Sequence, residues 1–116
     1  MIRFSKQELS FFVDSLEKVL ENDNGRKVFK AYLKSIGKHD LILAVKLWKK
    51  ASKYLEDKRE IDVAIKKMIW EIDDFDADEI PGSNEVNLNW IKMTCINILE
   101  KVHRNFSNYV IKLHSS

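Results

Sequence analysis

The stretch Gly25–Leu55, GRKVFKAYLKSIGKHDLILAVKLWKKASKYL, decides the fold. Its first half repeats apolar residues at helical spacing along one face, which predicts an amphipathic helix as far as Ile36. From Asp40 to Leu55 the chain is apolar on more than one side, and Trp48 lies on the main stripe. A helix that faces solvent needs only a narrow apolar stripe, so this second half predicts a central helix surrounded by the others.

The N-terminal segment carries a clear helix start. Ser5–Glu8 has the serine-x-x-glutamate form of a capping box, directly before an apolar run with helical periodicity. That run predicts one continuous helix, which ends at the cluster of turn-forming residues after Glu21. Asp23 or Asn24 is expected to cap the helix that follows.

Two further helices are expected after the central one. Asp57–Glu60 repeats the capping-box pattern and predicts the start of a helix there. Val63 and Trp70 fall off the main apolar stripe of that helix, so we expect it to be covered on a second side. The last helix should be interrupted by the polar residues His103–Asn105 and resume as a short amphipathic segment.

Length and composition place these helices in one domain. A chain of 116 residues can bury a sizeable core by itself, and 45% of its residues are hydrophobic. Three glycines and one proline provide little turn material for a β-rich fold. We therefore predict an all-α, single-domain bundle of five to seven helices over residues 1–116.

The cellular setting is also constrained. A single cysteine, Cys95, cannot form an internal disulfide, which favours a reducing compartment. No apolar run approaches the ~20 residues that span a bilayer, and the N-terminus lacks the layout of a signal peptide. We expect a cytoplasmic, monomeric domain, either alone or as part of a longer protein. Cys95 lies on an apolar helical face, which indicates a small buried hydrophobe and not a nucleophile.

The overall charge of +2 hides a strong asymmetry. Residues 26–58 carry ten basic and three acidic side chains, a net charge of +7 that leaves −5 for the remainder. Four lysines of the central helix share one face: Lys46, Lys49, Lys50 and Lys53. Such a face is typical either of a solvated helix surface or of docking to phosphates and anionic headgroups.

The acidic connection before the last helix resembles a calcium loop in part. Asp74, Asp76, Asp78 and Glu85 fall at positions 1, 3, 5 and 12 of a twelve-residue loop, where carboxylates hold the ion. Glu79, however, occupies the position that requires glycine. We expect no metal and no cofactor. No phosphate loop or activated nucleophile is present in the sequence, so we expect no enzyme.

Four segments together resemble a known family. Ser15–Leu20 is similar to the opening "S-(F/L)-E-x-L-L" helix of the RGS (regulator of G-protein signalling) homology domain, and Gly25–Ser35 to its "G-R-x-x-F-x-x-F-L-x-S" segment. His39–Leu41 falls where that family has "E-N-L", and Asn105–Val110 resembles its "S-Y-P-x-F-L". The resemblance covers about residues 10–113 and implies the same all-helical fold.

The resemblance also implies a partner and contact residues. Members that accelerate GTP hydrolysis brace the switch segments of a Gα subunit in the transition-state shape. By position, the partner-binding residues here are His39, Asp40, Asp74, Asp76, Arg104 and Asn105. The bracing glutamate–asparagine pair of the family is replaced by His39 and Asp40, and the acidic connection offers no bracing asparagine.

The sequence therefore predicts a non-catalytic protein-binding signalling module of RGS-homology type, without strong GTPase-activating activity. Its partner is expected to be a Gα subunit or another signalling protein. Two alternatives stay open: a functional GTPase-activating regulator of a heterotrimeric G-protein alpha subunit, and an electrostatic docking domain for anionic membrane or nucleic acid. Of the latter, peripheral membrane contact stays open, and nucleic acid is not expected.

Overall fold

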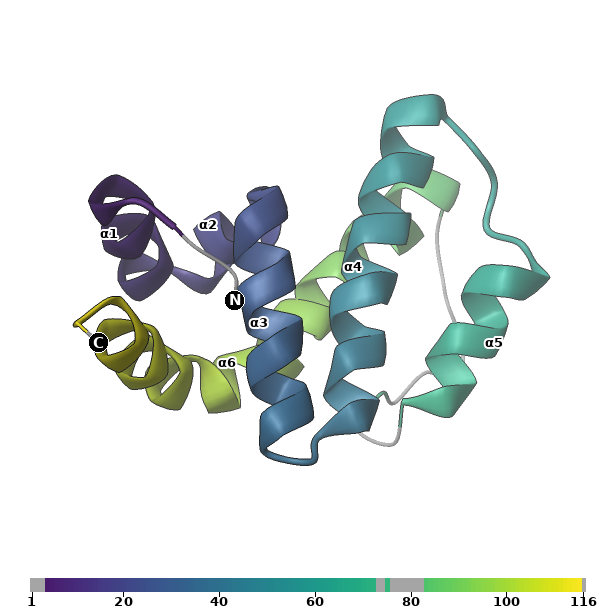
Figure 1. Ribbon diagram of the computed structural model, residues 1–116. Helices are drawn as coiled ribbons and strands as arrows, with labels where there is room; N and C mark the ends of the chain where they lie inside the picture. Colours follow the sequence, from purple (N-terminus) through teal and green to yellow (C-terminus); the bar gives the residue numbers. More distant parts are fainter. Residues whose placement is uncertain (1–3, 73–74, 76–82, 116) are drawn as a thin grey trace.

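The computed structural model describes residues 4–72, 75 and 83–115, and those residues form an all-α fold of six helices without a strand (Figure 1). The helices are α1 (Lys6–Asp14), α2 (Leu16–Glu21), α3 (Asp23–Ser35), α4 (His39–Asp57), α5 (Val63–Glu71) and α6 (Asn84–Ser115). The predicted fold class, a bundle of five to seven helices, is confirmed. No helix of this described part is long and apolar enough to cross a membrane.

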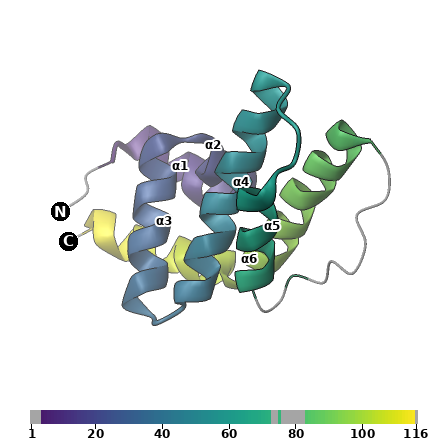
Figure 2. The same cartoon turned by 90° about the vertical axis from the view of Figure 1, so that its right-hand side faces the viewer.

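The arrangement centres on α3, α4 and α6. Figure 1 and Figure 2 both show α3 and α4 side by side, with the long helix α6 running across them. A short turn joins α3 to α4, and Gly37 adopts φ +73° there, a conformation that favours glycine. Helices α1 and α2 pack against the C-terminal half of α6, and α5 packs against α4. The first and last described segments lie close together, since the centres of the Phe4 and His114 rings are 5.7 Å apart.

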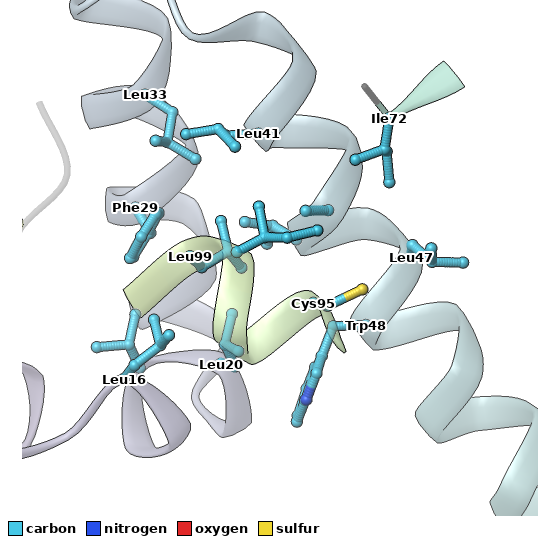
Figure 3. Close-up of a cluster of buried hydrophobic side chains, with 14 of the residues drawn as sticks. Leu16, Leu20, Phe29, Leu33, Leu41, Leu47, Trp48, Ile72, Cys95 and Leu99 are labelled. Atoms are coloured by element: carbon cyan, nitrogen blue, oxygen red, sulfur yellow. The ribbon is translucent and has the colours of Figure 1, made fainter. Parts of the chain in front are cut away.

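Helix α4 is the predicted central helix, two residues longer at its end and one at its start than expected. It contacts α2, α3, α5 and α6, and seven of its side chains are buried: Leu41, Ala44, Val45, Leu47, Trp48, Ala51 and Tyr54. Figure 3 shows side chains from α2, α3, α4 and α6 converging on one apolar cluster. Burial of Trp48, which is 4% exposed, confirms its predicted place on the inner stripe.

The prediction of a single N-terminal helix is wrong, because the helix is interrupted at Ser15 between α1 and α2. Ser15 is extended (φ −153°), and its hydroxyl accepts a hydrogen bond from the Lys18 N–H at 3.1 Å, so it caps α2. The capping box at Ser5–Glu8 is confirmed, with both hydrogen bonds at 3.0 Å. The next cap is Asn22, and not Asp23 or Asn24, since its side chain accepts from the Gly25 N–H at 2.9 Å.

The junction of α2 and α3 is unusually tight at Gly25. A Cβ added to Gly25 would lie 2.3 Å from the Val19 carbonyl oxygen and 3.1 Å from the Phe12 ring. Glycine is therefore required here for close backbone approach. Next to it, the buried Arg26 donates to the Leu20 carbonyl at 2.5 Å and thereby ties the end of α2 to the start of α3.

The predicted start of the fifth helix is also wrong. Helix α4 continues through Asp57, and the actual cap of α5 is Asp62, whose carboxylate accepts from the Ile65 N–H at 3.2 Å. The expected second covered side of α5 is absent as well: Val63 is 80% and Trp70 78% exposed. The reason is that α5 packs mainly against α4, so its opposite face has no described neighbour.

Helix α6 runs through the predicted break at His103–Asn105 without interruption. Its apolar stripe keeps the same phase on both sides of those polar residues: Cys95, Ile98 and Leu99 before them, Phe106 and Val110 after them, are all buried. Arg104 and Asn105 are exposed on the outer side of that stripe. His103, by contrast, is partly buried, and its Nε2 lies 2.9 Å from the Phe12 carbonyl oxygen. The three polar residues therefore do not mark a helix end.

Candidate partner-binding groove

A groove of about 380 Å³ lies between α3 and α4 and continues to the linker before α5. It is lined by Arg26, Lys30, Val45, Lys46, Lys49, Lys50, Lys53, Tyr54 and Arg59. We call it the cationic groove, because seven of these nine residues carry a positive charge. All four lysines of the predicted basic face belong to it. Helices α3 and α4 pack side by side (Figure 2). The groove lies between them and is lined by basic residues from both.

Three of the seven cations already have carboxylate partners within the domain. Arg26 pairs with Asp23. The Arg59 guanidinium lies 3.7 Å from an Asp62 oxygen, and the Lys53 ammonium 3.7 Å from an Asp57 oxygen. Both arginines therefore direct donor groups at a carboxylate of their own chain.

The other four cations, Lys30, Lys46, Lys49 and Lys50, form no ion pair with any described residue. Lys30 comes from α3 and is partly buried, whereas the other three come from α4. Burial lowers the pKa of Lys30, and repulsion by Lys46, Arg26 and Lys27 lowers it further. The groove thus holds positive charge that the described part of the fold leaves uncompensated.

Two buried side chains lie at the base of the groove. Val45 and Tyr54 are buried there. The Arg59 guanidinium lies 4.4 Å from the centre of the Tyr54 ring, and the Lys50 ammonium 6.0 Å from it. The Tyr54 hydroxyl donates to Asp62 at 2.7 Å. That hydrogen bond raises the pKa of Tyr54, lowers the pKa of Asp62, and fixes the ring in place.

The residues predicted from the family resemblance lie elsewhere. His39 is exposed as the first residue of α4, and Asp40 next to it is partly buried. Arg104 and Asn105 are exposed in the middle of α6. No hydrogen bond or ion pair between described residues joins these two pairs, and Asp74 and Asp76 lie outside the described residues.

The remaining candidates for chemistry were also located. Within residues 4–72, 75 and 83–115, no three His, Cys, Asp or Glu side chains are close enough to hold a metal ion. Of the four residues with calcium-loop spacing, only Glu85 is among the described residues, in the first turn of α6. Asp74, Asp76 and Asp78 lie outside the described residues. Cys95 is fully buried, as predicted, and burial raises the pKa of its thiol to about 12, so it stays a neutral core residue.

Sequence reasoning found the lysines of one groove wall but not the groove itself. Arg26 and Lys30 were visible as nearby basic residues, yet only the packing of α3 beside α4 places them in one cavity with Lys46. The place of Arg59 in the groove could not be predicted from the sequence, because Arg59 was expected in the first turn of a helix. In the structure that helix is capped by Asp62 and Arg59 precedes it. No protein-family model, no curated protein and no solved structure matches the chain.

Proposed function

We propose that this domain is a non-catalytic protein-binding module of RGS-homology type that holds an acidic segment of a signalling partner in the cationic groove. The observation that carries the proposal is a group of four lysines in one groove that form no ion pair with any described residue: Lys30, Lys46, Lys49 and Lys50. An acidic segment would supply the missing negative charges. Electrostatic complementarity of this kind favours fast and selective encounter with acidic partners.

A protein segment fits this groove better than a membrane or a nucleic acid does. The cations line a concave space, which an extended chain can enter but a bilayer surface cannot follow closely. Binding of single-stranded nucleic acid relies on exposed aromatic rings that stack on bases. The aromatic ring of the groove, Tyr54, is only 3% exposed and already lies beneath Arg59.

GTPase activation is not part of the proposal. Bracing requires donors and acceptors held against the groups that move in the transition state. Asp40 can only accept hydrogen bonds when ionised, unlike an asparagine amide. Arg104 and Asn105 lie on an uninterrupted helix and not in a loop between helices. We expect less than a tenfold acceleration of single-turnover GTP hydrolysis by Gα subunits, about 1.4 kcal/mol of barrier, with excess domain.

Binding of a fluorescein-labelled peptide rich in glutamate tests the proposal. The wild-type domain should raise its fluorescence anisotropy at low salt, and the signal should weaken as salt screens the charges. The double variant Lys46→Glu/Lys50→Glu should lose binding. A matched double variant, Lys67→Glu/Lys101→Glu, makes the same charge change at exposed lysines outside the groove and should lose much less. Equal losses in both variants would mean that overall charge, and not the groove, attracts the peptide.

A further inference from the structure

The cationic groove carries an inference about the chemistry of its occupant, which rests on the proposed function. We propose that the groove recognises a phosphorylated side chain within the acidic segment, with Lys30 of α3 and Lys46 of α4 as its principal contacts. The reason lies in which cations of the groove are free and which are engaged.

Three cations of the groove are engaged within the chain: Arg26, Arg59 and Lys53. A guanidinium is planar and matches a carboxylate or a phosphate with two parallel hydrogen bonds. Arg26 and Arg59 both direct their donors at Asp23 and Asp62 of the same chain. Arg26 is further held by the Leu20 carbonyl, and it is only 9% exposed. Arg26 is therefore not available to a partner, whereas Arg59 is engaged only through the single 3.7 Å contact with Asp62.

The four cations that form no ion pair within the described part of the chain are all lysines. An ammonium is a compact point charge with three donors and no acceptor, and it can turn toward an oxygen from several directions. A phosphate group offers three strong acceptor oxygens and a charge of about −1.5 to −2 near neutral pH. One phosphate can accept hydrogen bonds from several lysines at once, which a carboxylate with two oxygens does less well.

The position of Lys30 strengthens this choice. It is partly buried and faces the repulsion of neighbouring cations from both helices, so its charged form is destabilised in the empty groove. A dianion would compensate more of this repulsion than a monoanion at the same place. The groove volume of about 380 Å³ lies within the range of ligand pockets and can hold one modified side chain with its neighbours.

Three labelled peptides separate this inference from the proposed function. They share a flanking sequence of glutamate and glycine and carry phosphoserine, glutamate or serine at the centre. We expect the phosphoserine peptide to bind at least about tenfold more tightly than the glutamate peptide at pH 7.5. The advantage should shrink at pH 5.5, where the phosphate approaches a single charge, because its second pKa is about 6. The glutamate peptide should change little over the same range.

Variants assign the preference to named residues. Lys30→Gln and Lys46→Gln should each reduce the ratio of phosphoserine to glutamate affinity, whereas Lys67→Gln on α5 should leave that ratio unchanged. Circular dichroism of each variant confirms that it is folded. An unchanged ratio in both groove variants would overturn the assignment of Lys30 and Lys46.

The remaining outcomes are equally informative. If all three peptides bind with one affinity, the phosphate inference is overturned and the proposed function stands. If none binds, both fail. If none binds but vesicles of phosphatidylcholine and phosphatidylserine retain the domain, the groove is a membrane site and both proposals are overturned.

Discussion

The two faces of α4 differ in composition and in exposure: one is apolar and buried, and the other carries lysines along the cationic groove. The inner face holds Leu41, Ala44, Trp48 and Ala51 at 0–6% exposure against the rest of the core. The outer face holds Lys46, Lys49, Lys50 and Lys53 along the cationic groove. One helix can thus hold the core together through its inner face while its outer face stays available to a partner. Changes on the inner face should therefore alter stability, and changes on the outer face should alter binding.

The largest expected effect is on the inner face. Trp48→Ala removes a buried aromatic side chain and should lower the free energy of unfolding by ~3–5 kcal/mol in a urea titration. Trp70→Ala is the matched control, because Trp70 is 78% exposed on the neighbouring helix α5 and should cost no more than about 0.5 kcal/mol. Similar losses for the two variants would contradict the division between buried and exposed faces.

A smaller loss of stability is expected where the groove wall is anchored. Gly25→Ala places a methyl group within 2.3 Å of the Val19 carbonyl oxygen, so the α2–α3 junction must shift. Overpacking of this kind costs ~1–3 kcal/mol, measurable in the same urea titration. Because Arg26 and Lys30 follow on α3, the variant should also weaken peptide binding. A fully stable Gly25→Ala protein would mean that the two helices lie farther apart than described.

Removing a charge from the other wall of the cationic groove, at Lys30 of α3, should change stability in the opposite direction. The pKa of Lys30 is lowered in the folded state, so the unfolded chain binds more protons at Lys30 between the folded pKa and its ordinary value. The contribution of Lys30 to the free energy of unfolding therefore increases as the pH rises through that window. At neutral pH, where Lys30 is charged in both states, it opposes folding. Lys30→Gln should raise the melting temperature slightly at pH 7 and reduce this alkaline rise.

Thermal melts at pH 7 and at alkaline pH measure both effects, with Lys67→Gln as the exposed control. A lower melting temperature for Lys30→Gln at pH 7 would show that Lys30 stabilises the fold. In that case the cations of the groove would not be kept for binding at the expense of stability.

The same contrast explains what the sequence could predict. The central helix was predictable because its apolar residues form a wide periodic stripe around Trp48, and periodicity reflects burial directly. The break at Ser15 was not, because the apolar spacing continues across it and only the cap hydrogen bond to Lys18 reveals it. The predicted break at His103–Asn105 was wrong for the converse reason. Arg104 and Asn105 lie on the outer face and His103 contacts the Phe12 carbonyl, so the apolar stripe continues past all three polar residues.

The candidate site shows a similar limit. The lysine face of α4 follows from helical spacing alone, so those four residues were predictable. Their proximity to Lys30 depends on the packing of α3 beside α4 across the turn at Gly37. That packing is tertiary structure, which helical spacing alone does not predict. The covered second side expected for α5 failed because off-stripe apolar residues such as Val63 are buried only where a neighbour exists.

The most direct measurement of the central claim follows binding and stability in the same samples of the Lys46→Glu/Lys50→Glu variant. Peptide anisotropy reports on the outer face, and thermal unfolding by circular dichroism reports on the inner one. The account predicts that this variant loses binding of the glutamate-rich peptide while its helical content and melting temperature stay at or above those of the wild type. Retained binding, or a loss of binding that accompanies unfolding, would contradict the separation of the two faces.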